Sequence, residues 1–267
     1  MNLFLKEVKR NSVTLVIWST VILVLISVTM AVYPAFLANQ SKIMAMLTII
    51  PKGALQFKGI SNFMDLLSPV GFYAANNVIY MMVLGSIYAI ILGSNIVLRE
   101  EYEKTAEYLL SWPVSRTEVF ISKGAVVVLN IVLLNLIAFT AGLIWILLVK
   151  TGPFNFNGYL ILSVYTIMLN LFFGAAGLFI STLIRNAKPI TTFSVGLVLI
   201  LYFIETISKI TEGISGIGYL SPFRYARVDA VSPDYGLDAI NLLFFIGLSF
   251  LFGTLAWTIY RRKDIYL

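Results

Sequence analysis

The sequence predicts an all-α polytopic membrane protein with six transmembrane helices, and three observations support this prediction. The chain of 267 residues is 59% hydrophobic, whereas soluble domains are roughly 45–50% apolar. Its mean hydropathy of +0.91 is that of a chain whose main solvent is lipid. Six stretches are also long enough to cross the hydrocarbon core of a bilayer, which takes about 20 apolar residues.

The six apolar stretches organise residues 1–267 as a single transmembrane domain. They cover residues 13–33, 73–98, 119–149, 159–184, 190–207 and 237–260. The first follows the charged run KEVKR, as the apolar part of a signal peptide would. This stretch is longer than the apolar region of a signal peptide, and no small-x-small cleavage site follows it. We therefore expect the first span to be retained.

The distribution of lysine and arginine predicts the orientation in the membrane. Six spans place both termini on one side, and basic residues are frequent in the short segments on that side. These residues are Lys6, Lys9, Arg10, Arg99, Lys104, Arg116, Lys123, Arg185, Lys188, Arg261, Arg262 and Lys263. Because short cytoplasmic loops are rich in Lys and Arg, we expect both termini to be cytoplasmic. The chain is thus predicted to be a multi-pass protein of the cell membrane, the inner or plasma membrane of a bacterium.

Two longer segments on the opposite side are predicted to form short helices. Residues 34–72 and 208–236 contain apolar runs that are too short or too rich in glycine to cross the bilayer. We interpret them as interfacial or re-entrant helices at the outer leaflet.

Acidic residues are concentrated in one cytoplasmic segment. Five of the thirteen acidic residues lie between Leu98 and Lys123. Residues 100–110 have the pattern of an amphipathic helix that is too short to span, with Glu100, Glu103 and Glu107 outside its apolar face. An acidic face fits the anionic cytoplasmic leaflet poorly, so we expect a protein partner with basic residues.

The segment then turns into the third span through a predicted helix start. Ser115 and Glu118 have the spacing of a capping box, in which each side chain bonds the backbone amide of the other. Pro113 precedes it, and the helix is predicted to run from Arg116 to Val149. The third span is therefore expected to enter the membrane at a fixed angle.

The run EEYEKTAEYLLSWPVSR, followed by Lys123, resembles the cytoplasmic signature of type-2 ABC transporter permeases. In that family a glutamate-rich stretch leads to Gly-Thr, Leu-Leu, Pro-Val-Ser-Arg and a downstream lysine. The matching positions are Glu101, Glu103, Thr105, Leu109, Leu110, Pro113, Val114, Ser115, Arg116 and Lys123. Lys104 departs from the pattern, because the family usually has glycine there. KEVKR, LSPF and YRRKDI resemble further parts of these permeases, so the resemblance covers the whole chain.

The resemblance implies a permease subunit of an ATP-driven exporter. Such a subunit pairs with a second permease copy, usually an identical one, and with two copies of a cytoplasmic ABC ATP-binding subunit that hold ATP and Mg. Residues 100–110 would be the coupling helix that docks on the ATPase. The residues expected at this contact are Glu100, Glu101, Glu103, Thr105, Leu109, Leu110, Pro113 and Arg116. The alternative is a solvated amphipathic loop that only joins two spans.

The resemblance also implies a cargo and a transport mode. The expected cargo is amphipathic or hydrophobic, such as a peptide, a drug or a lipid-like molecule, and it would leave the cytoplasm by alternating access. Two alternatives come from other classes: an ATP-independent secondary transporter or channel, and a non-transporting membrane sensor or immunity subunit. The spans hold few carboxylates and the chain has no histidine, so a secondary transporter would have few groups to carry protons.

The composition excludes several chemistries for the chain itself. It has no histidine and no cysteine, which removes the commonest general base and the commonest zinc ligands. It also lacks a Walker phosphate loop. We therefore expect no catalytic residue, no metal site and no cofactor bound by this chain, and the net charge of +6 is not interpreted as nucleic-acid binding.

Five polar residues within or beside the spans are candidates for a substrate path. They are Asn76, Asn77, Tyr80, Tyr88 and Glu205. The first three could instead anchor the span at the outer interface. Glu205 is an ionisable residue in an apolar run, which suggests function, but Lys209 at i+4 also allows a structural ion pair.

The second span also carries a ridge of small residues. Gly85, Ala89 and Gly93 are spaced by four, a pattern that allows another helix to approach closely. The approaching helix could belong to the same chain or to a second copy.

Overall fold

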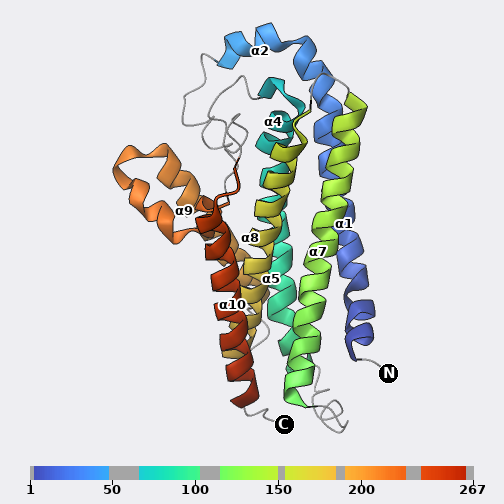
Figure 1. Ribbon diagram of the computed structural model, residues 1–267, viewed down its shortest axis with the longest axis vertical. Helices are drawn as coiled ribbons and strands as arrows, with labels where there is room; N and C mark the ends of the chain where they lie inside the picture. The colour runs from blue at the N-terminus through green and yellow to red at the C-terminus, as the bar shows by residue number, and fades with distance from the viewer. Residues whose placement is uncertain are drawn as a thin grey trace.

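The computed structural model describes residues 3–47, 66–102, 115–149, 154–184, 190–226 and 236–262. Within these ranges the chain is helical apart from short connections, and no strand occurs. Six helical segments are long and apolar enough to cross a membrane. Figure 1 shows them as a bundle with both chain termini at one end and α2 at the other. The predicted all-α polytopic fold with six spans is confirmed.

The described residues form eleven helical elements. They are α1 (Leu3–Ala38), α2 (Gln40–Leu47), α4 (Pro69–Tyr73), η2 (Ala74–Val78), α5 (Ile79–Tyr102), α7 (Arg116–Val149), α8 (Phe156–Leu183), α9 (Ile190–Ile210), η3 (Glu212–Leu220), η4 (Pro222–Arg224) and α10 (Ala239–Arg262). Helix α1 begins well before the predicted apolar stretch, because the Lys, Glu and Arg residues ahead of it are themselves good helix formers. It also continues through Pro34 into the predicted outer segment.

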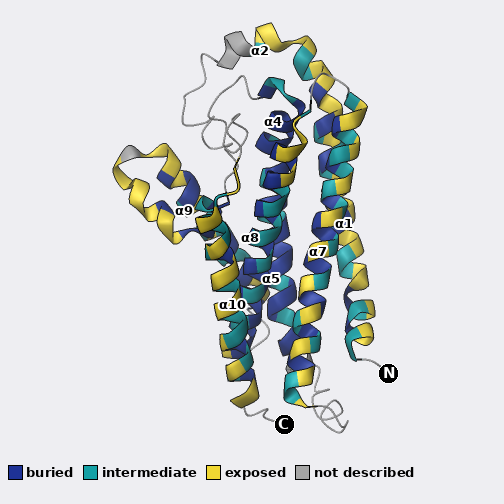
Figure 2. Cartoon of the chain, in the orientation of Figure 1, coloured by how far each residue is buried: buried dark blue, intermediate teal, exposed yellow. Residues whose placement is uncertain are grey.

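Helices α5 and α8 form the centre of the bundle, and small residues bring their backbones together. An added Cβ at Gly93 would collide with the backbone carbonyl oxygen of Gly174. One at Gly177 would lie 2.5 Å from the carbonyl oxygen of Ile90. Figure 2 shows the resulting pattern, with α5 largely buried and many exposed residues on α9 and α10. The small-residue ridge of α5 therefore packs against a helix of the same chain, and not against a second copy.

The remaining helices surround this pair. Helix α1 packs on α7, α10 packs mainly on α8, and α9 contacts α5 and η3. Between α4 and α5, residues Ala74–Val78 form a π-helical turn, which carries more residues than an α-helical turn. The second span, residues 69–102, is thus a helix with one irregular turn.

Part of the predicted outer segment after α9 folds back as 3-10 helix. Residues of η3 pack against α9, and the chain kinks at Ile214, whose φ is −126° and ψ is 21°. The hydroxyl of Ser221 donates to the carbonyl oxygen of Leu201 at 2.7 Å, which fixes the end of the return beside α9. This short helix agrees with the expected helical character of the segment 208–236, of which residues 227–235 lie outside the described ranges.

The α5–α8 contact generates a first prediction. Gly93→Ala places a methyl group against backbone atoms that cannot move aside, and overpacking of this kind costs about 1–3 kcal/mol. We expect a lower thermal unfolding midpoint of the detergent-purified chain, followed by circular dichroism. Gly196→Ala is the matched control, because an added Cβ there meets nothing within 4 Å. An equal midpoint for both variants would contradict the close packing.

Candidate functional site

The structure contains the predicted capping box at the start of α7. The amide of Ser115 donates to Oε2 of Glu118 at 2.8 Å, and the amide of Glu118 donates to Oγ of Ser115 at 3.2 Å. Helix α7 begins at Arg116 and runs for 34 residues to Val149. The reciprocal bonds satisfy two amides that a helix start leaves without partners, so the direction of α7 is set at its first residue.

Lys123 joins α7 to α5 next to this start. Its side chain is completely buried, at 0% exposure, and its Nζ donates to the carbonyl oxygen of Ile96 at 2.6 Å. A buried cationic hydrogen bond is strong and expensive to break. The two helices on either side of residues 103–114 are therefore fastened to each other. The sequence identified Lys123 as a signature position but did not predict this contact, because Ile96 is no neighbour in the chain.

The residues expected to contact an ATPase lie at or beyond the ends of these helices. Glu100 and Glu101 belong to the last turn of α5. Glu103, Thr105, Leu109, Leu110 and Pro113 lie outside the described residues, as does most of the predicted coupling helix 100–110. Nη1 of Arg116 donates to the carbonyl oxygen of Arg261 at a long 3.5 Å, so this residue links the start of α7 to the end of α10.

The candidate path residues of the second span do not form one site. The side-chain amide of Asn76 donates to the backbone carbonyl oxygen of Phe72, one helical turn earlier. Tyr80 is 39% exposed. Asn77 is buried, and its amide has no hydrogen-bond partner among the described residues. Tyr88 lies further along the span, where its hydroxyl donates to Oδ1 of Asn130 at 3.3 Å.

A row of polar side chains crosses the interior from α5 to α8 and α7. The hydroxyl of Ser86 donates to Oδ1 of Asn170 at 3.2 Å, and Nδ2 of Asn170 donates to Oδ1 of Asn135 at 3.3 Å. All three are buried, and such bonds between membrane helices contribute about 0.6 kcal/mol each on average. Sequence reasoning missed this row. The available signal was the pair of asparagines at positions 135 and 170, each in an otherwise apolar span.

A cavity of about 220 Å³ lies beside this polar row. Its walls come from α4, η2, α5, α7 and α8 and are mostly apolar, with Asn135, Ser163 and Thr166 as polar exceptions. Asn135 therefore belongs to both the polar row and the cavity wall. None of the five candidate path residues lines this cavity, although Tyr73 and Val78 beside them do.

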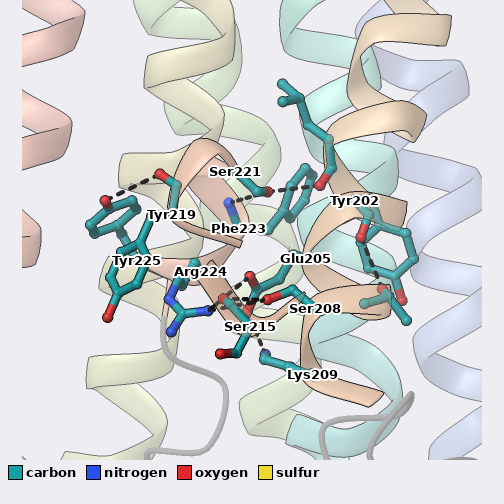
Figure 3. A network of polar contacts seen from close by, with 12 residues as sticks. Tyr202, Glu205, Ser208, Lys209, Ser215, Tyr219, Ser221, Phe223, Arg224 and Tyr225 are labelled. Atoms are coloured by element: carbon teal, nitrogen blue, oxygen red, sulfur yellow. Dashed lines mark hydrogen bonds and ion pairs between the residues drawn. The ribbon is translucent and has the colours of Figure 1, made fainter. Parts of the chain in front are cut away.

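Glu205 lies in a polar cluster between α9, η3 and η4, shown in Figure 3. Its side chain is only 5% exposed, and Oε1 lies 3.2 Å from Nζ of Lys209. The expected i, i+4 ion pair is thus present, as in the structural alternative. Oε2 also lies 4.0 Å from Nη1 of Arg224, a second cation that sequence spacing could not indicate because it arrives on the folded-back segment.

Arg224 in turn fastens η3. Its Nη1 donates to the carbonyl oxygen of Ser215 at 3.1 Å, and its guanidinium lies 4.0 Å from the ring centre of Tyr219. The close approach requires glycine at position 218, where an added Cβ would lie 2.7 Å from Oε2 of Glu205. One buried carboxylate therefore holds α9, η3 and η4 together.

The cluster predicts unequal effects for two glycines of η3. Gly218→Ala pushes against Glu205 and Arg224, and we expect faster amide hydrogen exchange over residues 211–226. Gly216→Ala serves as the control, because an added Cβ there meets nothing within 4 Å. Glu205→Gln should resemble Gly218→Ala, since it removes the charge that pairs with both cations. Unchanged exchange in Gly218→Ala and Glu205→Gln would show that the cluster does not hold η3.

Comparison with known families agrees with this architecture. Residues 1–265 match the family described as "ABC-2 family transporter protein". A search of curated proteins found no match. The match spans nearly the whole chain, including all six membrane-crossing segments and the α5–α7 junction. The chain therefore belongs to the ABC-2 family of transporter membrane proteins.

Proposed function

We propose that this chain is the permease subunit of an ATP-driven exporter and that separate ABC ATP-binding subunits, holding ATP and Mg, drive it. The observation that carries the proposal is the fastened junction of α5 and α7. The capping box sets the direction of α7, and the buried Lys123 bond ties it to α5. A displacement of the acidic segment between them would therefore move both helices together.

The bundle offers a route for such a displacement across the membrane. At about 1.5 Å per residue, the 34 residues of α7 extend about 50 Å, which exceeds the roughly 30 Å of hydrocarbon. Helix α5 is packed tightly on α8 through Gly93 and Gly177, so these two helices would shift as a unit. Movement of this unit against a second permease copy would alternate access to a path between the copies.

The cavity beside the polar row supports an amphipathic or hydrophobic cargo, such as a peptide, a drug or a lipid-like molecule. Its wall is mainly apolar, and its few polar groups are uncharged side chains of α7 and α8. The basic residues at the end of the bundle that holds both termini support a cytoplasmic placement of that end. Export, rather than import, is the direction that the resemblance to type-2 ABC transporter permeases implies.

Charge reversal in the acidic segment tests the docking. The double variant Glu101→Lys and Glu103→Lys replaces an acidic contact with a basic one, and we expect the ATPase to be lost from the copurified complex. Glu212→Lys is the control, because it reverses one acidic charge at the start of η3, in the segment predicted to lie on the opposite side of the membrane. Binding and ATP turnover should be measured in the same preparation. An ATPase that copurifies equally with both variants would contradict the docking, and a chain that is always purified alone would favour an ATP-independent transporter or a sensor.

A second variant tests transmission through the junction. Lys123→Met keeps the apolar stem but removes the bond to Ile96, and loss of a charged hydrogen bond of about 1.5 kcal/mol corresponds to roughly a tenfold effect. We expect the ATPase to remain bound while the amount of cargo moved per ATP hydrolysed falls about tenfold in reconstituted vesicles. Lys42→Met, at an exposed position of α2, should leave this ratio unchanged. An unchanged ratio in Lys123→Met would show that the bond between Lys123 and Ile96 does not couple ATP hydrolysis to transport.

A further inference from the structure

An apolar groove of about 770 Å³ lies between α7, α8 and α10. Its volume is within the range of about 300–1,000 Å³ that is usual for ligand sites. The walls include Val128, Leu171, Ala175, Phe250 and Trp257. Four of them belong to the halves of these helices nearest the end of the bundle that holds both termini, and Phe250 lies at the middle of α10. The groove therefore runs from the middle of the bundle toward the end that holds both termini.

Two glycines in the groove do not serve helix packing. An added Cβ at Gly253 would meet nothing within 4 Å, and one at Gly124 would meet only Cδ1 of Leu178, at 4.0 Å. Glycine costs about 1 kcal/mol relative to alanine inside a helix. At Gly93 the contact with α8 explains that cost, but at these two positions the only structural effect is a wider groove. The shape therefore suits an occupant from outside the chain.

One end of the groove combines a tryptophan ring with positive charge. Trp257 lines this end of the groove. The guanidinium of Arg261 lies 5.0 Å from the centre of the Trp257 rings, and Arg262 follows directly. Both arginines are exposed. Basic sites between membrane helices are suited to anionic lipid headgroups, and tryptophan favours the level of the headgroups.

We propose that this groove holds an acyl chain of one anionic phospholipid, with the phosphate at Arg261 and the Trp257 ring at the level of the headgroup. The proposal goes beyond transport, because the lipid is a resident ligand and its binding needs no ATP. Charge favours a lipid over a second copy of the chain as the occupant. Two copies inserted in the same orientation would bring the same arginines to this end of the groove, where like charges repel.

Native mass spectrometry of the purified full-length chain tests the proposal, with phosphatidylglycerol and phosphatidylcholine as probes. We expect one tightly retained phosphatidylglycerol per chain. Gly253→Leu fills the groove and should weaken its retention about tenfold. Gly247→Leu is the matched control on the same helix, since an added Cβ there also meets nothing within 4 Å and the position is outside the groove. Arg261→Gln should reduce the preference for phosphatidylglycerol about fivefold.

Three outcomes would overturn the proposal. The first is equal retention of phosphatidylglycerol by Gly253→Leu and Gly247→Leu. The second is a wild-type chain that retains both lipids equally. The third is a Gly253→Leu variant that changes from dimer to monomer while its lipid count stays the same, which would assign the groove to a second copy. None of these measurements involves an ATPase, so their failure is distinguishable from failure of the proposed transport function.

Discussion

The close approach of α5 and α8 is the contact on which the rest of the bundle depends. Lipid supplies no hydrophobic force between helices, so their association relies on close van der Waals packing and interhelical hydrogen bonds. Gly93, Gly174 and Gly177 supply the first, and the bonded row of Ser86, Asn170 and Asn135 supplies the second. The outer helices α1, α9 and α10 attach to this centre or to α7, which itself contacts both α5 and α8.

Local patterns predicted from the sequence agree well with the structure. The six spans, the capping box of Ser115 and Glu118, the extent of α7 and the pairing of Glu205 with Lys209 all depend on residues that are close in the chain. Contacts between distant segments could not be derived in this way. Arg224 reaches Glu205 only because η3 folds back, and Lys123 reaches Ile96 only because α5 and α7 are adjacent.

The contrast between local and long-range contacts also explains why the candidate path residues were only partly identified. Spacing of small residues on α5 predicts a close helix contact but not which helix makes it, since the pattern is the same for either partner. Polarity singled out Asn76, Asn77, Tyr80 and Tyr88, yet the polar residue of the cavity wall that also joins the interhelical row is Asn135. An asparagine in a span shows that a partner is needed, whereas the identity of that partner depends on how the helices rotate about their axes.

The π-helical turn of residues 74–78 determines one such rotation. A π-helical turn holds an additional residue, and each residue of an α-helix turns the chain by about 100°. The turn therefore allows α4 to present Tyr73 to Tyr159, with ring centres 5.2 Å apart, while α5 presents its glycines to α8. The orientation of α4 about the helix axis is thus independent of the orientation of α5. Loss of a single residue here would make the helix regular. The contact of Tyr73 with Tyr159 and the contact of the α5 glycines with α8 could then not both keep their present geometry.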